Sequence, residues 1–385
     1  MHDFHQQLDE LARQSLLRTR RTVSSAQGPL LTVEARPYLS FCSNDYLGLA
    51  NHPAITAAAV TALGQYGMGA AASALISGHS AAHETLERAL ADFTGLPAAL
   101  GFGSGYMANM GVIGALVGAG DTVVVDRLSH ASLIDGARLS GASLKVFPHN
   151  DTQRLDQVLA RCGSGRKLVV TDAVFSMDGD QAPLAELAEI CARHGAWLLV
   201  DDAHGFGVLG PQGRGSLAHA GVGAPHVLCM GTLGKAAGVA GAFVAGERDL
   251  LAWIMQRART YMFSTAHPPA LAAAATASLA VIAADEWRRT HLRALVAQLR
   301  KGLAGLSWQL LPSQTPIQPL IIGDNARARA LMQQLREQGI WVPAICPPTV
   351  PRMTARLRIS LSALHTQEQV AQLIEALVQA EQVAA

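Results

Sequence analysis

The chain has 385 residues, of which 50% are apolar and 15% are charged. With 30 basic and 29 acidic side chains, it carries no electrostatic signature of a partner for DNA, RNA or an anionic membrane. The 5 cysteines form no C-x-x-C pair, which argues against a disulfide framework, and no metal site is expected. The N-terminal segment lacks the apolar stretch of a signal peptide, so we expect a cytoplasmic protein.

Short runs rich in valine and leucine alternate with segments of helical spacing from residue 98 onward. The runs predicted as strands are AALGF (98–102), TVVVD (122–126), LKVFP (144–148), KLVVTDA (167–173) and AWLLVD (196–201). Pro183 to His194 has the spacing of a helix that begins at a proline. This alternation predicts an α/β fold with a mainly parallel sheet covered by helices. Ligands of such sheets bind beyond the carboxyl ends of the strands.

The alanine-rich run at 268–285 is expected to be a buried helix, because the charged residues EWRR follow it at once. After Asp285 the pattern changes to charged helices with two strand-like runs, at 316–324 and 356–362, and a final helix near 366–380. We therefore predict an N-terminal segment (1–45), a large domain (46–285) and a smaller α+β C-terminal domain (286–385).

Glycines follow the first predicted strand in the stretch GFGSGYMAN (101–109). Glycines between a strand and a helix let backbone N–H groups approach a phosphate, and the start of the helix favours its charge. Gly105 and Tyr106 are the candidate phosphate contacts. Because a nucleotide site has similar glycines, and Asp126 ends the next strand, the motif alone leaves a dinucleotide-binding oxidoreductase open.

Four further polar residues follow later strands. Asp201 ends a strand, where a carboxylate suits a protonated ring nitrogen, and His130 has a planar ring that suits stacking on a cofactor. Ser176 and His204 could join Asp201 in a hydrolase triad, but no G-x-S-x-G motif surrounds the serine. That hydrolase is therefore the weaker hypothesis.

Lys235 lies in GTLGKAAG (231–238), among residues too small to pair with it. The stretch suits either a solvated surface lysine or a desolvated one, and desolvation produces a neutral, nucleophilic amine. A phosphate cradle, an aspartate, an aromatic stacker and such a lysine are together the parts that hold pyridoxal phosphate as a Schiff base.

The chain resembles the α-oxoamine synthases, pyridoxal phosphate (PLP) enzymes of the aspartate aminotransferase fold, fold type I. The motifs that carry the resemblance span most of the chain: SNDYLGL (43–49), DRLSHASL (126–133), VFSMDGD (174–180), VDDAHGFGVLG (200–210), GRGS (213–216) and TLGK (232–235). The C-terminal motifs IQPLIIGDN (317–325), PPTVP (347–351) and TARLRISLSALH (354–365) indicate the biotin-biosynthesis branch.

The resemblance implies roles for individual residues. It implies that Lys235 forms the Schiff base, Asp201 pairs with the pyridine nitrogen and His130 stacks on the cofactor ring. It also implies that His204 and Ser176 contact the phenolic oxygen or the face of the cofactor. Lys235, His130, Asp201 and His204 would be catalytic. The implied phosphate contacts are Gly105, Tyr106 and Thr232. Arg358, helped by Asn44, would bind the amino-acid carboxylate, and His130, Arg18 and Thr349 would contact the acyl substrate.

The implied reaction is an acyl transfer that joins L-alanine to a pimeloyl thioester of coenzyme A or acyl carrier protein. The resemblance also implies a homodimer with shared active sites, in which Ser264 or Thr265 reaches the partner's phosphate. The segment at 67–87, where members of the family meet their dimer partner, is richer in alanine here, which leaves the interface details open. The PRMT at 351–354 also differs from the family pattern. The alternatives are a glycine C-acetyltransferase, a 5-aminolevulinate synthase or a catalytically silent regulatory subunit.

Overall fold

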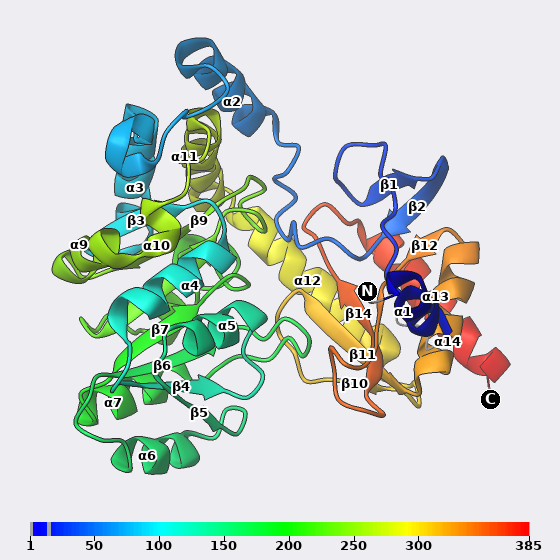
Figure 1. The fold of residues 1–385 in the computed structure, drawn as a ribbon. Coiled ribbons are helices and arrows are strands. Elements are labelled where there is room, and N and C mark those ends of the chain that lie inside the picture. Colours follow the sequence, from blue (N-terminus) through cyan, green and yellow to red (C-terminus); the bar gives the residue numbers. More distant parts are fainter. Residues whose placement is uncertain (1–2, 14–16, 385) are drawn as a thin grey trace.

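The five strands predicted between residues 98 and 201 lie in one seven-stranded sheet in a computed structural model that describes residues 3–13 and 17–384 (Figure 1). In spatial order the strands are β3 (Ala98–Phe102), β9 (Ala242–Gly246), β8 (Val227–Thr232), β7 (Trp197–Asp201), β6 (Lys167–Asp172), β4 (Thr122–Asp126) and β5 (Ser143–Phe147). Strands β8, β7, β6, β4 and β5 are parallel, whereas β9 runs antiparallel to both its neighbours. The expected mainly parallel sheet is confirmed.

Helices cover both faces of this sheet because its inner strands present apolar side chains to both sides. Val123 and Val125 pack in one core with helices on one face, while Val124 packs in a second core on the other. The first face carries α4 (Gly105–Leu116), α5 (Ala131–Leu139), α9 (Arg248–Arg257) and α10 (Arg259–Met262). The second carries α6 (Thr152–Ala160), α7 (Leu184–Arg193) and the short α8 (Ser216–Ala220). The turns after the parallel strands therefore meet at one edge.

Three more helices pack together at one end of this large half (Figure 1). They are α2 (Pro53–Tyr66), α3 (Ala81–Thr94) and α11 (Pro269–Ala284). Helix α11 is the alanine-rich run that the sequence predicts as a buried helix, and half of its residues are indeed buried. No single helix in the described ranges is long and apolar enough to cross a membrane; α11 and the following helix pass that test only as a pair, bent by 68°.

The smaller half is built around a second sheet. Its strand order is β10 (Gln309–Leu310), β11 (Ile317–Gly323), β14 (Ala355–Ser360) and β13 (Ala344–Ile345). The helices α12 (Glu286–Leu303), α13 (Asn325–Glu337) and α14 (Gln367–Ala384) pack around it, and α12 runs from the large half into the small one (Figure 1). The predicted α+β character of this region agrees with the structure.

The N-terminal segment pairs with the C-terminal half. Strands β1 (Leu30–Val33) and β2 (Arg36–Ser40) form a hairpin, and β2 pairs in parallel with β12 (Ile340–Trp341). Helix α1 (Phe4–Arg13) precedes them and has no buried residue. The domain limits at 45 and 285 stay predictions, although Asp285 is also the residue between α11 and α12.

Gly179 lies where the two halves meet. Its carbonyl accepts hydrogen bonds from Ser313 Oγ at 2.8 Å and Thr315 Oγ1 at 3.1 Å, both from the smaller half. Its φ is +70°, and a Cβ added there would overlap the carbonyl oxygen of Ile317. The position therefore requires glycine for two reasons, the left-handed backbone and the close approach of the other half.

Gly179→Ala is expected to lower the free energy of unfolding by about 3 kcal/mol, because it adds a steric clash to the backbone penalty. Gly195→Ala is the matched control: φ is +58° there, yet a Cβ would meet nothing within 4 Å. That variant should lose only about 1 kcal/mol. Chemical denaturation of both variants measures the difference, and equal losses would show that the contact with Ile317 is not tight.

Candidate active site

Lys235 follows β8 and is half-buried at the carboxyl edge of the large sheet. Its Nζ lies 2.8 Å from His204 Nε2. Burial lowers the pKa of Lys235 to about 8, while the nearby charges of Asp201 and Asp172 oppose that shift. The neutral fraction of this amine near physiological pH is therefore far larger than for a solvated lysine, so the desolvated interpretation of the glycine-rich stretch agrees with the structure and the solvated one does not.

His204 is buried in the turn after β7 and has a partner on each ring nitrogen. Its Nδ1 lies 2.7 Å from the hydroxyl of Tyr46, and its Nε2 faces Lys235. Burial, followed by the charges of Lys235 and Arg358, lowers the pKa of His204 well below its ordinary value. The neutral imidazole connects the lysine to Tyr46, and no ring nitrogen is left for a hydrolase serine.

Arg358 lies in β14 of the smaller half and is buried. Its Nε donates to the carbonyl of Ser176 at 2.5 Å, and its two terminal nitrogens lie 3.3 Å from Asn44 Oδ1. One of them also lies 3.5 Å from the Tyr46 hydroxyl. Within residues 3–13 and 17–384, no carboxylate lies within ion-pair distance of Arg358. A buried guanidinium held by neutral oxygens is suited to a carboxylate ligand.

Asp201 ends β7 with a carboxylate that is held rather than solvated. Asn109 Nδ2 donates to it at 2.7 Å, and the same amide lies 2.9 Å from Ser132 Oγ. Asp172, which ends the neighbouring strand β6, is its register partner. Burial, and then the charge of Asp201, raises the pKa of Asp172 well above its ordinary value. The raised pKa favours the protonated form of Asp172, and the Asp201 carboxylate, fixed by Asn109, is placed to pair with a protonated ring.

His130 stands at the start of α5 with its ring exposed. Its backbone N–H donates to Asp172 at 2.7 Å, and its Nδ1 lies 2.8 Å from Ser132 Oγ. The ring of Tyr106 meets it edge-on, with centroids 6.3 Å apart. The imidazole is thus oriented by two contacts while its face stays accessible.

The first turn of α4 leaves the backbone N–H groups of Gly105 and Tyr106 without an intrahelical acceptor. Ser104 caps this helix by accepting from Met107 N at 3.3 Å. Thr232 ends β8 and donates to the carbonyl of Gly241 at 3.2 Å. The helix start has the donors and the dipole direction that an anion requires.

Some predicted residues lie outside this cluster. Arg18 and Thr349 are both exposed, and no hydrogen bond in the described structure joins either to the residues around Lys235. Ser264 and Thr265 line a small cavity with His79, His83 and His267. The roles assigned to these residues stay predictions.

Asp126 is unsuited to the ribose role that a nucleotide site would need. Its side chain is fully buried and accepts from His149 and from the backbone of Leu128 and Asn150. A dinucleotide-binding oxidoreductase is therefore disfavoured, because Asp126 is not available to bind a ribose.

Sequence reasoning assigned no role to Tyr46, Asn109 or Asp172, although each lies within a quoted motif or predicted strand. Tyr46 is in SNDYLGL, Asn109 ends the glycine-rich stretch, and Asp172 is the residue before the last in a predicted strand. For Asp172 the position at the strand end was an available signal. For Tyr46 and Asn109 the sequence contains no such signal apart from the motifs in which they lie.

The model of the aminotransferase class I and II family matches residues 36–377. The 8-amino-7-oxononanoate synthase of Aromatoleum aromaticum is 56% identical over 370 residues, which cover 96% of this chain and 96% of that protein. The chain belongs to the 8-amino-7-oxononanoate synthases. Among solved structures, the serine palmitoyltransferase of Sphingomonas wittichii is 34% identical, with a TM-score of 0.94 over 99% of each chain. A structure of SPT with PLP is 31% identical, also with a TM-score of 0.94 and 99% coverage of both chains.

Membership in these synthases confirms the predicted fold type I and the predicted cofactor, PLP. The residues present fit that cofactor. The lowered pKa of Lys235 provides a reactive amine, Asp201 is a fixed carboxylate, and the start of α4 offers free N–H groups to a phosphate. These features depend on this chain's own burial and hydrogen bonds.

Proposed function

We propose that this chain condenses L-alanine with a pimeloyl thioester, in biotin biosynthesis, to form 8-amino-7-oxononanoate, carbon dioxide and free thiol. The observation that carries the proposal is the polar chain from Lys235 through His204 and Tyr46 to Arg358. It joins a nucleophilic amine to a carboxylate-binding guanidinium, as an amino-acid substrate requires. The names of the curated relatives supply the choice of alanine and pimelate.

In this proposal, PLP supplies an electron sink for the carbanion that forms at the alanine Cα. Lys235 would hold its aldehyde carbon and Asp201 its ring nitrogen. His130 would lie on its face, with His204 and Ser176 beside it. Gly105, Tyr106 and Thr232 would hold its phosphate.

The chain's own residues also bind and activate the substrates. Arg358, with Asn44, binds the alanine carboxylate and fixes the Cα next to the lysine. The neutral form of Lys235, whose pKa is lowered to about 8, takes the proton from that carbon. His130 donates a hydrogen bond that polarises the thioester carbonyl, which the carbanion then attacks. A carbon–carbon bond forms, the carbon–sulfur bond breaks, and the departing thiolate takes up a proton from solvent. The alanine carboxylate leaves as carbon dioxide, and the proton held by Lys235 returns to the same carbon.

Two chains would share the active sites in this proposal. Thr265 is exposed and Ser264 half-buried in the isolated chain, and both lie next to a histidine-rich cavity. A second copy that presents these hydroxyls to the phosphate would complete the anion site at α4.

A substrate panel tests the function. The purified enzyme with PLP should release free thiol from pimeloyl-CoA or pimeloyl-acyl carrier protein when L-alanine is present, and mass spectrometry should detect the amino ketone. Glycine with acetyl-CoA, glycine with succinyl-CoA and serine with palmitoyl-CoA serve as the competing pairs. Faster turnover of a competing pair would assign the chain to a different α-oxoamine synthesis.

A further inference from the structure

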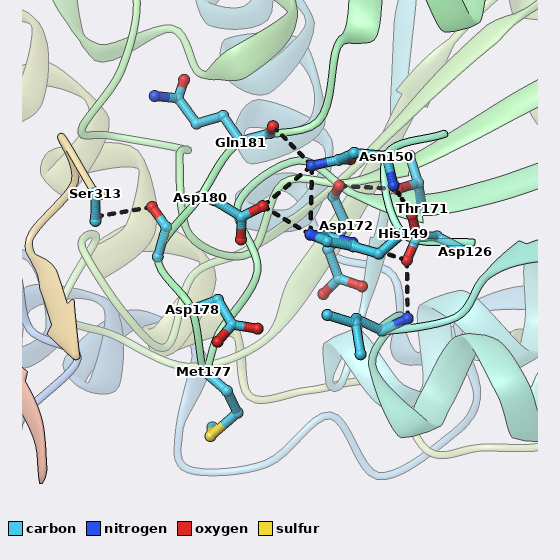
Figure 2. A network of polar contacts seen from close by, with 12 residues as sticks. Asp126, His149, Asn150, Thr171, Asp172, Met177, Asp178, Asp180, Gln181 and Ser313 are labelled. Carbon is cyan, nitrogen blue, oxygen red and sulfur yellow. Dashed lines mark hydrogen bonds and ion pairs between the residues drawn. The ribbon is translucent and has the colours of Figure 1, made fainter. Parts of the chain in front are cut away.

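A single imidazole, that of His149, lies between two carboxylates beside the site (Figure 2). Its Nδ1 is 3.1 Å from Asp126 Oδ1, and its Nε2 is 2.7 Å from Asp180 Oδ2. Ionised carboxylates only accept hydrogen bonds, so each ring nitrogen must donate, which requires the protonated imidazolium. Although burial opposes the charge, the bonds to both acids raise the pKa of His149 to about 9.

The Asp126 side of this contact is fixed to the large sheet. Asp126 is the last residue of β4, and its carboxylate also accepts the backbone N–H groups of Leu128 at 2.8 Å and Asn150 at 2.9 Å. The ring of His149 further packs edge-on against Phe175, with centroids 4.3 Å apart. His149 is therefore held at a constant place relative to the strand ends.

The Asp180 side belongs to the loop that follows β6. The loop closes on itself through the backbone bonds Phe175 N to Asp180 O and Gly179 N to Phe175 O, at 3.0 and 2.8 Å. Asn150 Nδ2 adds a bond of 3.0 Å to the Asp180 carboxylate. His149 and Asn150 are thus the side chains that connect this loop to the large sheet at Asp180 (Figure 2).

The same loop orients the buried arginines of β14. The carbonyl of Ser176 accepts from Arg358 Nε at 2.5 Å, and the carbonyl of Met177 accepts from Arg356 at 3.2 Å. Arg356 also forms an ion pair with Asp178. A shift of the loop would therefore move the acceptor that sets the direction of the Arg358 guanidinium.

We propose that His149 is a positioning residue for the amino-acid substrate, because it holds the loop at 175–181 in the place where Ser176 orients Arg358. Replacing His149 with a neutral residue would leave the carboxylates of Asp126 and Asp180 facing each other without a cation between them, and their repulsion would displace the loop. This inference rests on the proposed role of Arg358 in binding the alanine carboxylate. In this inference, His149 itself contacts neither the substrate nor the cofactor.

His149→Gln in the PLP-loaded enzyme is expected to raise the alanine KM about 10-fold while kcat changes less than about 3-fold, because binding is weakened and the chemistry is kept. The alanine affinity measured from the visible spectrum without thioester should fall by the same factor. In the cofactor-free protein, amide hydrogen exchange should become faster at 174–181. That last measurement needs no substrate, so it separates a failure of this inference from a failure of the proposed function.

Asp180→Asn in the His149→Gln background should restore most of the alanine affinity, since it removes the repulsion between the two acids. His194→Gln is the matched control: the Nε2 of His194 lies 2.9 Å from Asp156 at the surface, and the loss of this imidazole should leave the alanine KM unchanged.

Unchanged exchange at 174–181 together with an unchanged alanine KM in His149→Gln would overturn the inference. An equal fall of all activity with no rescue would do the same, as it indicates only a loss of folded protein. If His149→Gln does not fold, Asp180→Lys decides: a cation facing the protonated His149 should displace the loop and raise the alanine KM, and an unchanged alanine KM would overturn the inference.

Discussion

Replacing Lys235 with alanine is expected to lower turnover by at least about 10⁴-fold and to remove the visible absorbance that PLP gains when it is bound to the protein. The amine is the only proposed group that both captures the aldehyde and takes the Cα proton. His204 cannot replace it as the base, because burial lowers the pKa of His204 and makes it a weak proton acceptor, and one of its ring nitrogens is bonded to Tyr46. Turnover assays and absorption spectra of the purified variant measure both effects.

Lys167→Ala is the matched control for this variant. Lys167 is also half-buried and donates to the carbonyl of His194 at 3.1 Å, but it lies at the opposite end of a strand. Its removal should leave the spectrum and turnover unchanged. Turnover retained in Lys235→Ala would show that a different group performs the proton transfer.

The pKa of Lys235 also predicts how cofactor capture depends on pH. Only the neutral amine attacks the aldehyde, and burial lowers its pKa to about 8. The rate at which cofactor-free protein captures PLP should therefore rise about 5-fold from pH 7 to pH 8 and level off above about pH 9. A rate that continues to rise to pH 10 would indicate that the lysine keeps its ordinary pKa.

Arg358→Ala is expected to raise the apparent KM for alanine about 100-fold, because the variant loses a two-pronged, charge-assisted contact in a buried place. The KM for the pimeloyl thioester should change less than about 3-fold, since only alanine has a carboxylate in that position. Arg358→Lys keeps the charge but not the fork, so an intermediate loss is expected. Steady-state kinetics with each substrate varied in turn give the two constants.

Arg300→Ala controls for the removal of a partly buried arginine from the same half. Arg300 donates at 2.8 Å to Leu311 O and to Gln318 Oε1, both within the smaller half. The variant can lose stability, but its alanine KM should match that of the unmodified enzyme. An unchanged alanine KM in Arg358→Ala would show that the carboxylate binds elsewhere.

Much of the large half follows from local pattern. The five predicted strands all form, within one residue of the expected ends, because continuous apolar runs suit strands buried on both faces. Strands β8 and β9 were not predicted, although β8 leads directly to Lys235. Their runs are short and lie among glycines, where periodicity carries little signal.

The sequence by itself determined the kind of chemistry, because the residues that would carry it, such as Asp201 and Lys235, directly follow strands or glycine-rich turns of recognisable pattern. Only the tertiary structure decided which side chains meet. Tyr46 and His204 are 158 positions apart, yet their bond at 2.7 Å links the lysine to Arg358 of the other half. Periodicity reports whether a residue is buried, but the partner of a buried polar group depends on how distant elements pack, and no local pattern records that.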